Sequence, residues 1–154
     1  MDQASTSCLY IDPVAFPVEG VVVDCCYMAT ATNTTTGIGV DTNNSVGNSS
    51  IKDVKISNTT FNTSASGVRF TGNCDMIGVS TCSFIGLPAT AVAFDQAKNV
   101  KMTGCDFQAN NFDMFIKDGD NGGPFNIANN NFTSNISQVT TISSRFGKTN
   151  NSGY

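Results

Sequence analysis

The sequence repeats one pattern of apolar residues four times between residues 51 and 144. One column of the repeat recurs at intervals of 23, 23 and 25 residues: Val54, Ile77, Val100 and Phe125. Two residues after each of these stands a second column: Ile56, Val79, Met102 and Ile127. Five residues further stands a third: Phe61, Phe84, Phe107 and Phe132. A repeat of this length is typical of solenoids, in which each unit buries its apolar face against its neighbours.

The spacing within each repeat predicts strands. Nine or ten residues after the phenylalanines stands a fourth apolar column: Phe70, Phe94, Ile116 and Ile142. Two residues before each of these stands a fifth column: Val68, Val92, Met114 and Thr140. Apolar residues separated by two positions and then by a corner fit three short strands per repeat, whereas an amphipathic helix needs intervals of three and four. The sequence therefore predicts three strands in each turn of the chain.

The corners carry residues that tolerate a left-handed backbone or bond to their own main chain. At the first corner these are Asn58, Thr81, Gly104 and Asn129. We therefore predict an all-β fold, a right-handed parallel β-helix of about five rungs with repeats of 23 to 25 residues. Equal positions in successive rungs should stack about 4.8 Å apart.

Stacking makes the second and third columns a structural core ladder: Phe61, Phe84, Phe107, Phe132, Ile56, Val79, Met102 and Ile127. A neighbouring column, Thr59, Cys82, Cys105 and Asn130, should lean inward beside it.

We predict three segments. Residues 1–20 are an N-terminal cap or attachment segment, in which Leu9 and Ile11 start a strand; residues 21–144 are the β-helix, and residues 145–154 are a polar C-terminal tail. Val21, Val23, Met28, Ile38 and Val40 supply an earlier rung.

Charge and composition exclude several classes of binding partner. A net charge of −4 without a basic cluster argues against nucleic acid, and no apolar run is long enough for a membrane span. The first residues lack the features of a secretion signal. The six cysteines form no CxxC motif and there is no histidine, so we expect buried reduced thiols in place of a metal site.

The acidic residues form no recognisable catalytic cluster. Glycoside hydrolysis needs two carboxyl groups about 5 to 9.5 Å apart, and few acids share a column in adjacent rungs. Asp118 and Asp120 resemble a cation-binding turn but fit a solvated turn better, while Asp106 and Asp113 could face a groove without a paired acid. We predict no catalytic, cofactor-binding or metal-binding residue and no cofactor. Threonines at positions 30 to 36 do not recur at rung spacing, which disfavours an ice-binding array.

The polar corners and phenylalanine columns of residues 51–144 resemble the parallel β-helix superfamily of pectate lyases and bacteriophage tailspikes. The resemblance implies one of three roles: cleavage of acidic polysaccharides, cleavage or binding of bacterial surface glycans, or a passive trimeric part of a virion. Fold alone does not choose among them.

The dispersed acids favour the third role. We expect a non-enzymatic structural virion protein of a bacteriophage, either a capsid decoration (cement) protein or a tail or spike component. It would be made in the host cytoplasm and located in the virion as a homotrimer bound to the major capsid or tail protein. A small tailspike-type protein that binds or depolymerises a host surface glycan is the alternative.

Overall fold

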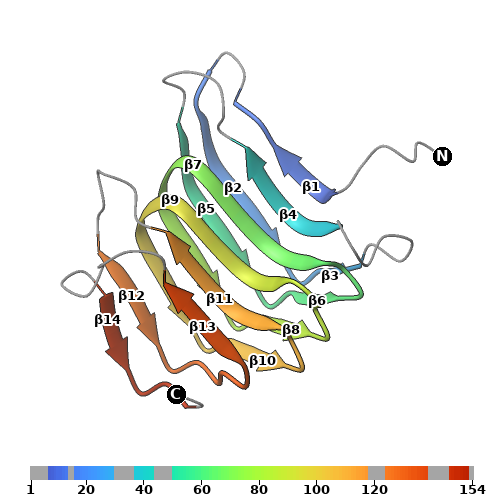
Figure 1. Cartoon of the computed structure of the whole chain (residues 1–154). Coiled ribbons are helices and arrows are strands. Elements are labelled where there is room, and N and C mark those ends of the chain that lie inside the picture. Colours follow the sequence, from blue (N-terminus) through green and yellow to red (C-terminus); the bar gives the residue numbers. More distant parts are fainter. Residues whose placement is uncertain are drawn as a thin grey trace.

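The computed structural model describes residues 7–13, 16–29, 37–43, 50–117, 124–138 and 146–152, and in these residues it contains fourteen β-strands and no helix. Every strand pairing in them is parallel. The strands are stacked in chain order, from β1 and β2 at one end to β13 and β14 at the other (Figure 1). The chain is therefore a parallel β-solenoid.

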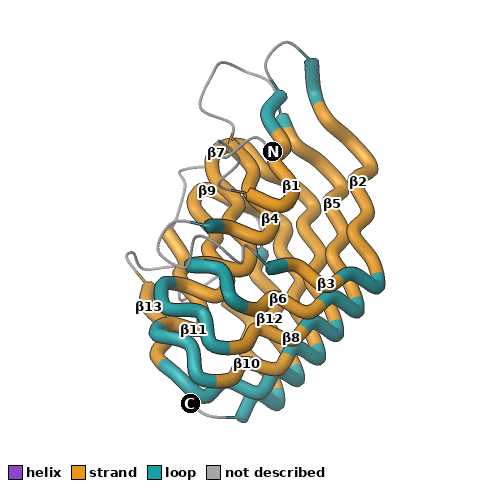
Figure 2. Tube along the Cα trace, turned by 90° about the vertical axis from the view of Figure 1, so that its right-hand side faces the viewer, coloured by secondary structure: helices purple, strands orange, loops and turns teal. Residues whose placement is uncertain are grey.

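Three faces run along the solenoid (Figure 2). Face A consists of β2 (Val18–Asp24), β5 (Ile51–Ser57), the second halves of β7 (Ser66–Ser80) and β9 (Thr90–Thr103), β12 (Phe125–Ala128) and β14 (Phe146–Thr149). Face B consists of β3 (Tyr27–Met28), β6 (Thr60–Asn62), β8 (Ser83–Ile85) and β10 (Asp106–Gln108). Face C consists of β1 (Ser7–Ile11), β4 (Ile38–Asn43), the first halves of β7 and β9, β11 (Phe112–Lys117) and β13 (Asn135–Gln138).

Within the continuously described residues 50–117, three consecutive turns have a strand on every face. They begin at β5, at the second half of β7 and at the second half of β9. The predicted parallel solenoid of three-stranded turns is confirmed. The predicted number of about five rungs is not.

The strand register follows the sequence columns. Val54 pairs with Ile77, Ile77 with Val100 and Val100 with Phe125. The earlier rung predicted from Val21 and Val23 is present, since these residues pair with Val54 and Ile56. Leu9 lies in β1 and pairs with Val40.

Left-handed backbone recurs at equivalent positions of successive turns. At the predicted first corner, positive φ angles of 47° to 66° occur in Cys25, Asn58, Thr81, Gly104, Asn129 and Asn150. Two further columns were not predicted: Gly20, Asp53, Met76 and Asn99 within face A, and Thr63, Gly86 and Ala109 after face B. Methionine and alanine do not signal this conformation in a sequence, so only stacking on a neighbour identifies Met76 and Ala109.

The last turn of face C corrects the sequence analysis. The structure pairs Met114 with Ile136 and Ile116 with Gln138, whereas we expected Thr140 and Ile142 in these positions. The corner after Phe132 is shorter than its predecessors because the Asp113 carboxylate binds the main-chain amides of Thr133 and Ser134 at 2.7 and 2.6 Å. Thr140 and Ile142 themselves lie outside the described residues.

The sheet extends into both terminal segments. Residues 1–20 include β1 and the start of β2, and residues 145–154 include β14, which pairs with β12. Ser152 forms an isolated parallel bridge with Asn131. The polar C-terminal segment therefore adds a strand to face A.

A stack of four phenylalanines fills the interior. The ring centroids of Phe61 and Phe84, of Phe84 and Phe107, and of Phe107 and Phe132 are 4.9, 4.9 and 4.8 Å apart. Glycines make room on the opposite wall: a Cβ atom at Gly67 would lie 2.6 Å from the Phe84 ring and 2.7 Å from the carbonyl oxygen of Ala91. Large and small columns therefore face each other across the core.

We predict that Phe84→Ala lowers the free energy of unfolding by about 3 to 5 kcal/mol, because it leaves a cavity between two stacked rings. Phe112, which is 36% exposed, is the control, and Phe112→Ala should cost clearly less. Chemical denaturation of both variants measures this. Equal losses would contradict the core position of Phe84.

We predict that Gly67→Ala costs about 1 to 3 kcal/mol of stability, because the added methyl overlaps the Phe84 ring and main chain. Gly78→Ala is the matched control, since its nearest neighbour would be the Lys55 side chain at an ordinary 3.8 Å. Thermal melts should separate the two variants, and a Gly67→Ala protein as stable as Gly78→Ala would rule out this close approach.

Candidate functional site

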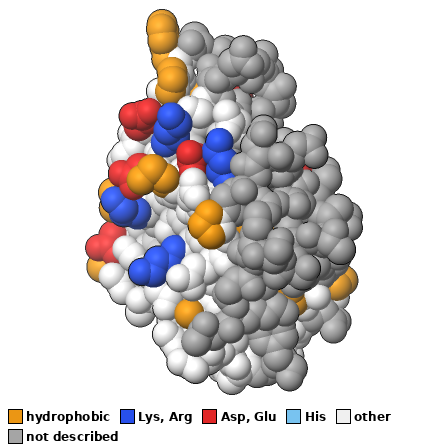
Figure 3. Space-filling model, turned by 90° about the vertical axis from the view of Figure 1, so that its left-hand side faces the viewer, with side chains coloured by type: hydrophobic (Ala, Val, Ile, Leu, Met, Phe, Trp, Pro, Cys, Tyr) orange, Lys and Arg blue, Asp and Glu red, His pale blue; other side chains and the backbone are white. Residues whose placement is uncertain are grey.

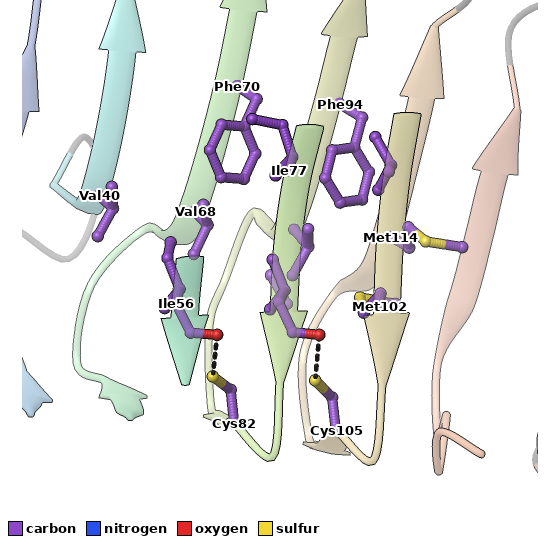
Figure 4. Close-up of a cluster of buried hydrophobic side chains, with 14 of the residues drawn as sticks. Val40, Ile56, Val68, Phe70, Ile77, Cys82, Phe94, Met102, Cys105 and Met114 are labelled. Atoms are coloured by element: carbon purple, nitrogen blue, oxygen red, sulfur yellow. Dashed lines mark hydrogen bonds between the residues drawn. The ribbon is translucent and has the colours of Figure 1, made fainter. Parts of the chain in front are cut away.

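The eight predicted core-ladder residues lie in the interior: Phe61, Phe84, Phe107, Phe132, Ile56, Val79, Met102 and Ile127 are each at most 1% exposed. Figure 4 shows Ile56 and Met102 among the apolar side chains that fill the space between the sheets. These residues contact one another and not the solvent, so their contribution is to packing.

A column of polar side chains runs beside the phenylalanine stack and will be called the capping ladder: Cys26, Thr59, Cys82, Cys105, Asn130 and Asn151. Cys82 Sγ lies 3.7 Å from the carbonyl oxygen of Ile56, and Cys105 Sγ lies 3.8 Å from that of Val79 (Figure 4). Each thiol thus reaches back to the main chain of the preceding rung.

Asparagines make the same contacts at the C-terminal end of the capping ladder. Asn130 Nδ2 donates to the carbonyl oxygen of Met102 at 3.2 Å, and its Oδ1 accepts from the amide of Cys105 at 2.9 Å. Asn151 repeats both contacts one rung later, with Ile127 and Asn130. The ladder satisfies main-chain groups at a corner where a buried unpaired group would cost about 1 to 3 kcal/mol.

All six cysteines are free thiols. Burial raises the pKa of Cys74 to about 11. The pKa of Cys105 is raised by its interaction with the Cys82 thiol and by burial. Cys74 and Cys105 are therefore protonated at neutral pH and act as small, weakly donating core residues, whereas the hydrogen bond with the Cys105 thiol lowers the pKa of Cys82.

Asp113 is the buried acid that the sequence did not assign. It is fully buried, and besides the amides of Thr133 and Ser134 it accepts a hydrogen bond from Asn110 Nδ2 at 3.0 Å. Asn110 in turn accepts from the amide of Leu87 and donates to the carbonyl of Phe84. The expectation that Asp113 could face a groove is wrong, because the carboxylate organises the bend between faces B and C.

A sequence signal for this cluster existed. Asn110 stands 23 residues after Leu87 and Asp113 stands opposite Ala91, so two polar residues occupy columns that are otherwise apolar or small. A polar residue in a buried column must find partners, and two such residues three positions apart can supply them to each other.

Asp106 belongs to an exposed polar network on face B. Its carboxylate accepts from Asn131 Nδ2 at 2.8 Å and from Gln108 Nε2, and Ser152 Oγ donates to Asn131 Oδ1 at 2.8 Å. Asp106 and Asp113 therefore make separate sets of contacts, one exposed and one buried. Asp118 and Asp120, the predicted cation-like turn, lie outside the described residues.

Face C carries one strong ion pair. Arg69 donates from Nε and Nη2 to the two carboxylate oxygens of Asp41 at 2.9 and 2.7 Å. Asp41 is 3% exposed, and its carboxylate raises the pKa of Arg69. Such a two-bond contact fixes the geometry of adjacent rungs and leaves no free acid at this point.

The outer surface mixes both charge signs. Figure 3 shows Lys, Arg, Asp and Glu side chains close together on one side of the molecule. On face A, Lys55 contacts Asp53 at 2.9 Å and Lys98 lies 4.0 Å from Asp75. Within the described ranges, His, Cys, Asp and Glu form no group of three or more able to hold a metal ion, and no helix could cross a membrane.

Large apolar side chains are exposed mainly in the first rung. Tyr10 is 51% exposed, Phe16 79%, Val22 65% and Tyr27 67%, and these four lie in β1 to β3 or between β1 and β2. We call them the N-terminal collar. They come from different faces of the solenoid, and single exposed apolar side chains are common on protein surfaces.

Comparison with known proteins finds no matching family model, no similar curated protein and no similar solved structure.

We predict that Cys25 is the cysteine whose labelling depends on its neighbour. Its side chain is exposed, and the Asp24 carboxylate raises its pKa, mainly through a hydrogen bond. Labelling with a thiolate-specific reagent should be slow at neutral pH, rise with pH, and become faster in Asp24→Asn at the same pH, because removal of the negative charge lowers the thiol pKa. Cys82 and Cys105 should stay protected in both proteins, which also verifies folding. A labelling rate of Cys25 that does not change in Asp24→Asn would contradict this assignment.

Proposed function

We propose that the chain is a non-enzymatic structural protein of a bacteriophage virion, either a capsid decoration protein or a tail or spike component. The observation that carries the proposal is the close packing of the interior in the described rungs. Stacked phenylalanines and the capping ladder fill the solenoid from rung to rung, so that buried polar groups such as Asp113 and Asn110 serve the main chain. A stiff rod with such a core suits a part that transmits or resists load.

The flank between faces A and B supports a homotrimer. Its outward positions Ser57, Ser80, Thr103 and Ala128 are small, uncharged and half-buried, and they stack in register. Small side chains let two such flanks approach closely. We propose threefold lateral association, with the major capsid or tail protein as a further partner and the virion as the location.

We also propose the finer features of the fold that the resemblance implies. These are a right-handed coil of about five rungs and membership of the parallel β-helix superfamily of pectate lyases and tailspikes. The right-handed sense is supported by the general preference of parallel crossovers.

A second candidate function is binding or depolymerisation of a host surface glycan. The network of Asp106, Gln108, Asn131 and Ser152 on face B favours it, because exposed carboxylate, amide and hydroxyl groups in one row can bond sugar hydroxyls. Tyr27 stands at the other end of the same column, where an aromatic ring can pack on a sugar.

Light scattering on the purified chain and mass spectrometry of intact phage particles test the main proposal. We expect a trimer in solution and the chain among the particle proteins. Incubation with capsular or O-antigen glycan should release no reducing ends. Glycan cleavage that disappears in Asp106→Asn would favour the second candidate, and a stable monomer absent from particles would contradict the first.

A further inference from the structure

The two ends of the solenoid differ in what they offer to another strand. At the N-terminal end, among the described residues, β2 pairs only with β5 and β3 only with β6, so each has one unpaired edge. At the C-terminal end β14 likewise pairs only with β12. An open edge accepts a further strand unless the sequence opposes it.

The C-terminal edge opposes addition. In the strand register Lys148 of β14 pairs with Ile127. A lysine in an edge strand is one way in which natural sheets discourage edge-to-edge association.

The N-terminal edge has the opposite character. Val21 and Val23 of β2 continue the inward columns up to the edge, and Val21 is only partly buried. Phe16 precedes β2 and Tyr27 follows it in the sequence, and these side chains are 79% and 67% exposed. A strand placed against β2 would extend the apolar core without enclosing a charge there.

The charges of this rung specify the partner. On face A a column alternates in sign from rung to rung, because Glu19 pairs with Lys52, Lys52 with Asp75 and Asp75 with Lys98. The next position beyond Glu19 therefore favours a cation. Residues 1–50 hold five acids and no lysine or arginine, which also favours a basic partner.

We propose that the free edge of β2 is a docking site for a parallel β-strand of a partner protein, with Lys or Arg opposite Glu19 and apolar residues opposite Val21 and Val23. Such a strand continues both the charge alternation and the core by one rung. This inference deepens the proposed structural role, on which it rests, by naming the attachment surface and the chemistry of the partner.

The chain's own β5 has the required pattern, since Lys52, Val54 and Ile56 stand opposite Glu19, Val21 and Val23 on the other edge of β2. The probe is therefore a synthetic peptide with the sequence of residues 51–57, added to the isotopically labelled full chain. We expect amide shifts in β1 to β3 and none in β14. A peptide carrying Lys52→Glu should bind about tenfold more weakly, since an attraction becomes a repulsion.

A charge exchange gives the decisive comparison. Glu19→Lys should weaken binding of the original peptide about tenfold and restore binding of the Lys52→Glu peptide. Lys101→Glu, a reversal of an exposed charge in β9 away from the edge, should change neither. Thermal melts verify that the Glu19→Lys protein folds. If it does not fold, the comparison of the original and Lys52→Glu peptides on the unaltered chain still tests the docking site.

Equal binding of both peptides, shifts at β14, or no binding at millimolar peptide would overturn the docking site. The virion proposal is judged separately by particle composition. If the chain is found in particles but does not bind the peptide, the structural role is kept and the docking site is rejected. If the chain binds the peptide but is absent from particles, the docking site is kept and the virion role is rejected.

Discussion

The structure depends on the vertical register between rungs. Each turn places the same positions about 4.8 Å above those of the previous turn, and the main-chain hydrogen bonds between parallel strands fix that distance. The phenylalanine stack, the capping ladder and the charge column on face A all follow from it, because each is one sequence position repeated along the axis. A one-residue slip would exchange inward and outward side chains in a whole strand.

Corners maintain this register with two devices. Left-handed residues turn the chain at the corner between faces A and B, and side chains of the capping ladder bond to main-chain groups beside that corner. The capping ladder uses cysteine, threonine and asparagine, which differ in donor strength. Asp113 and Asn110 solve the same problem at the bend between faces B and C with a carboxylate and an amide.

The columns of the core could be predicted from sequence because an inward position must be apolar in every rung, so Val54, Ile77 and Val100 recur at one interval. The position of Ile136 could not be predicted from sequence, because the length of a corner depends on which polar group binds the main-chain amides of that corner. The left-handed conformation of Met76 and Ala109 was equally hidden, since it is imposed by stacking on neighbours rather than by the residue's own preference. Asp113 was misplaced although a signal was present, because its position in the column of Ala91 indicates a buried residue.

The constant number of residues per turn also determines how such a chain can change in length. From β5 to the second half of β7 and from there to the second half of β9, each paired position on face A advances by one whole turn of the chain. Duplication or loss of a complete turn would therefore return every inward residue, corner and capping side chain to an equivalent neighbour. Insertion of a single residue in a strand would not. The solenoid can thus lengthen or shorten in whole units while the strands at its two ends, β2 and β14, keep their separate sequences.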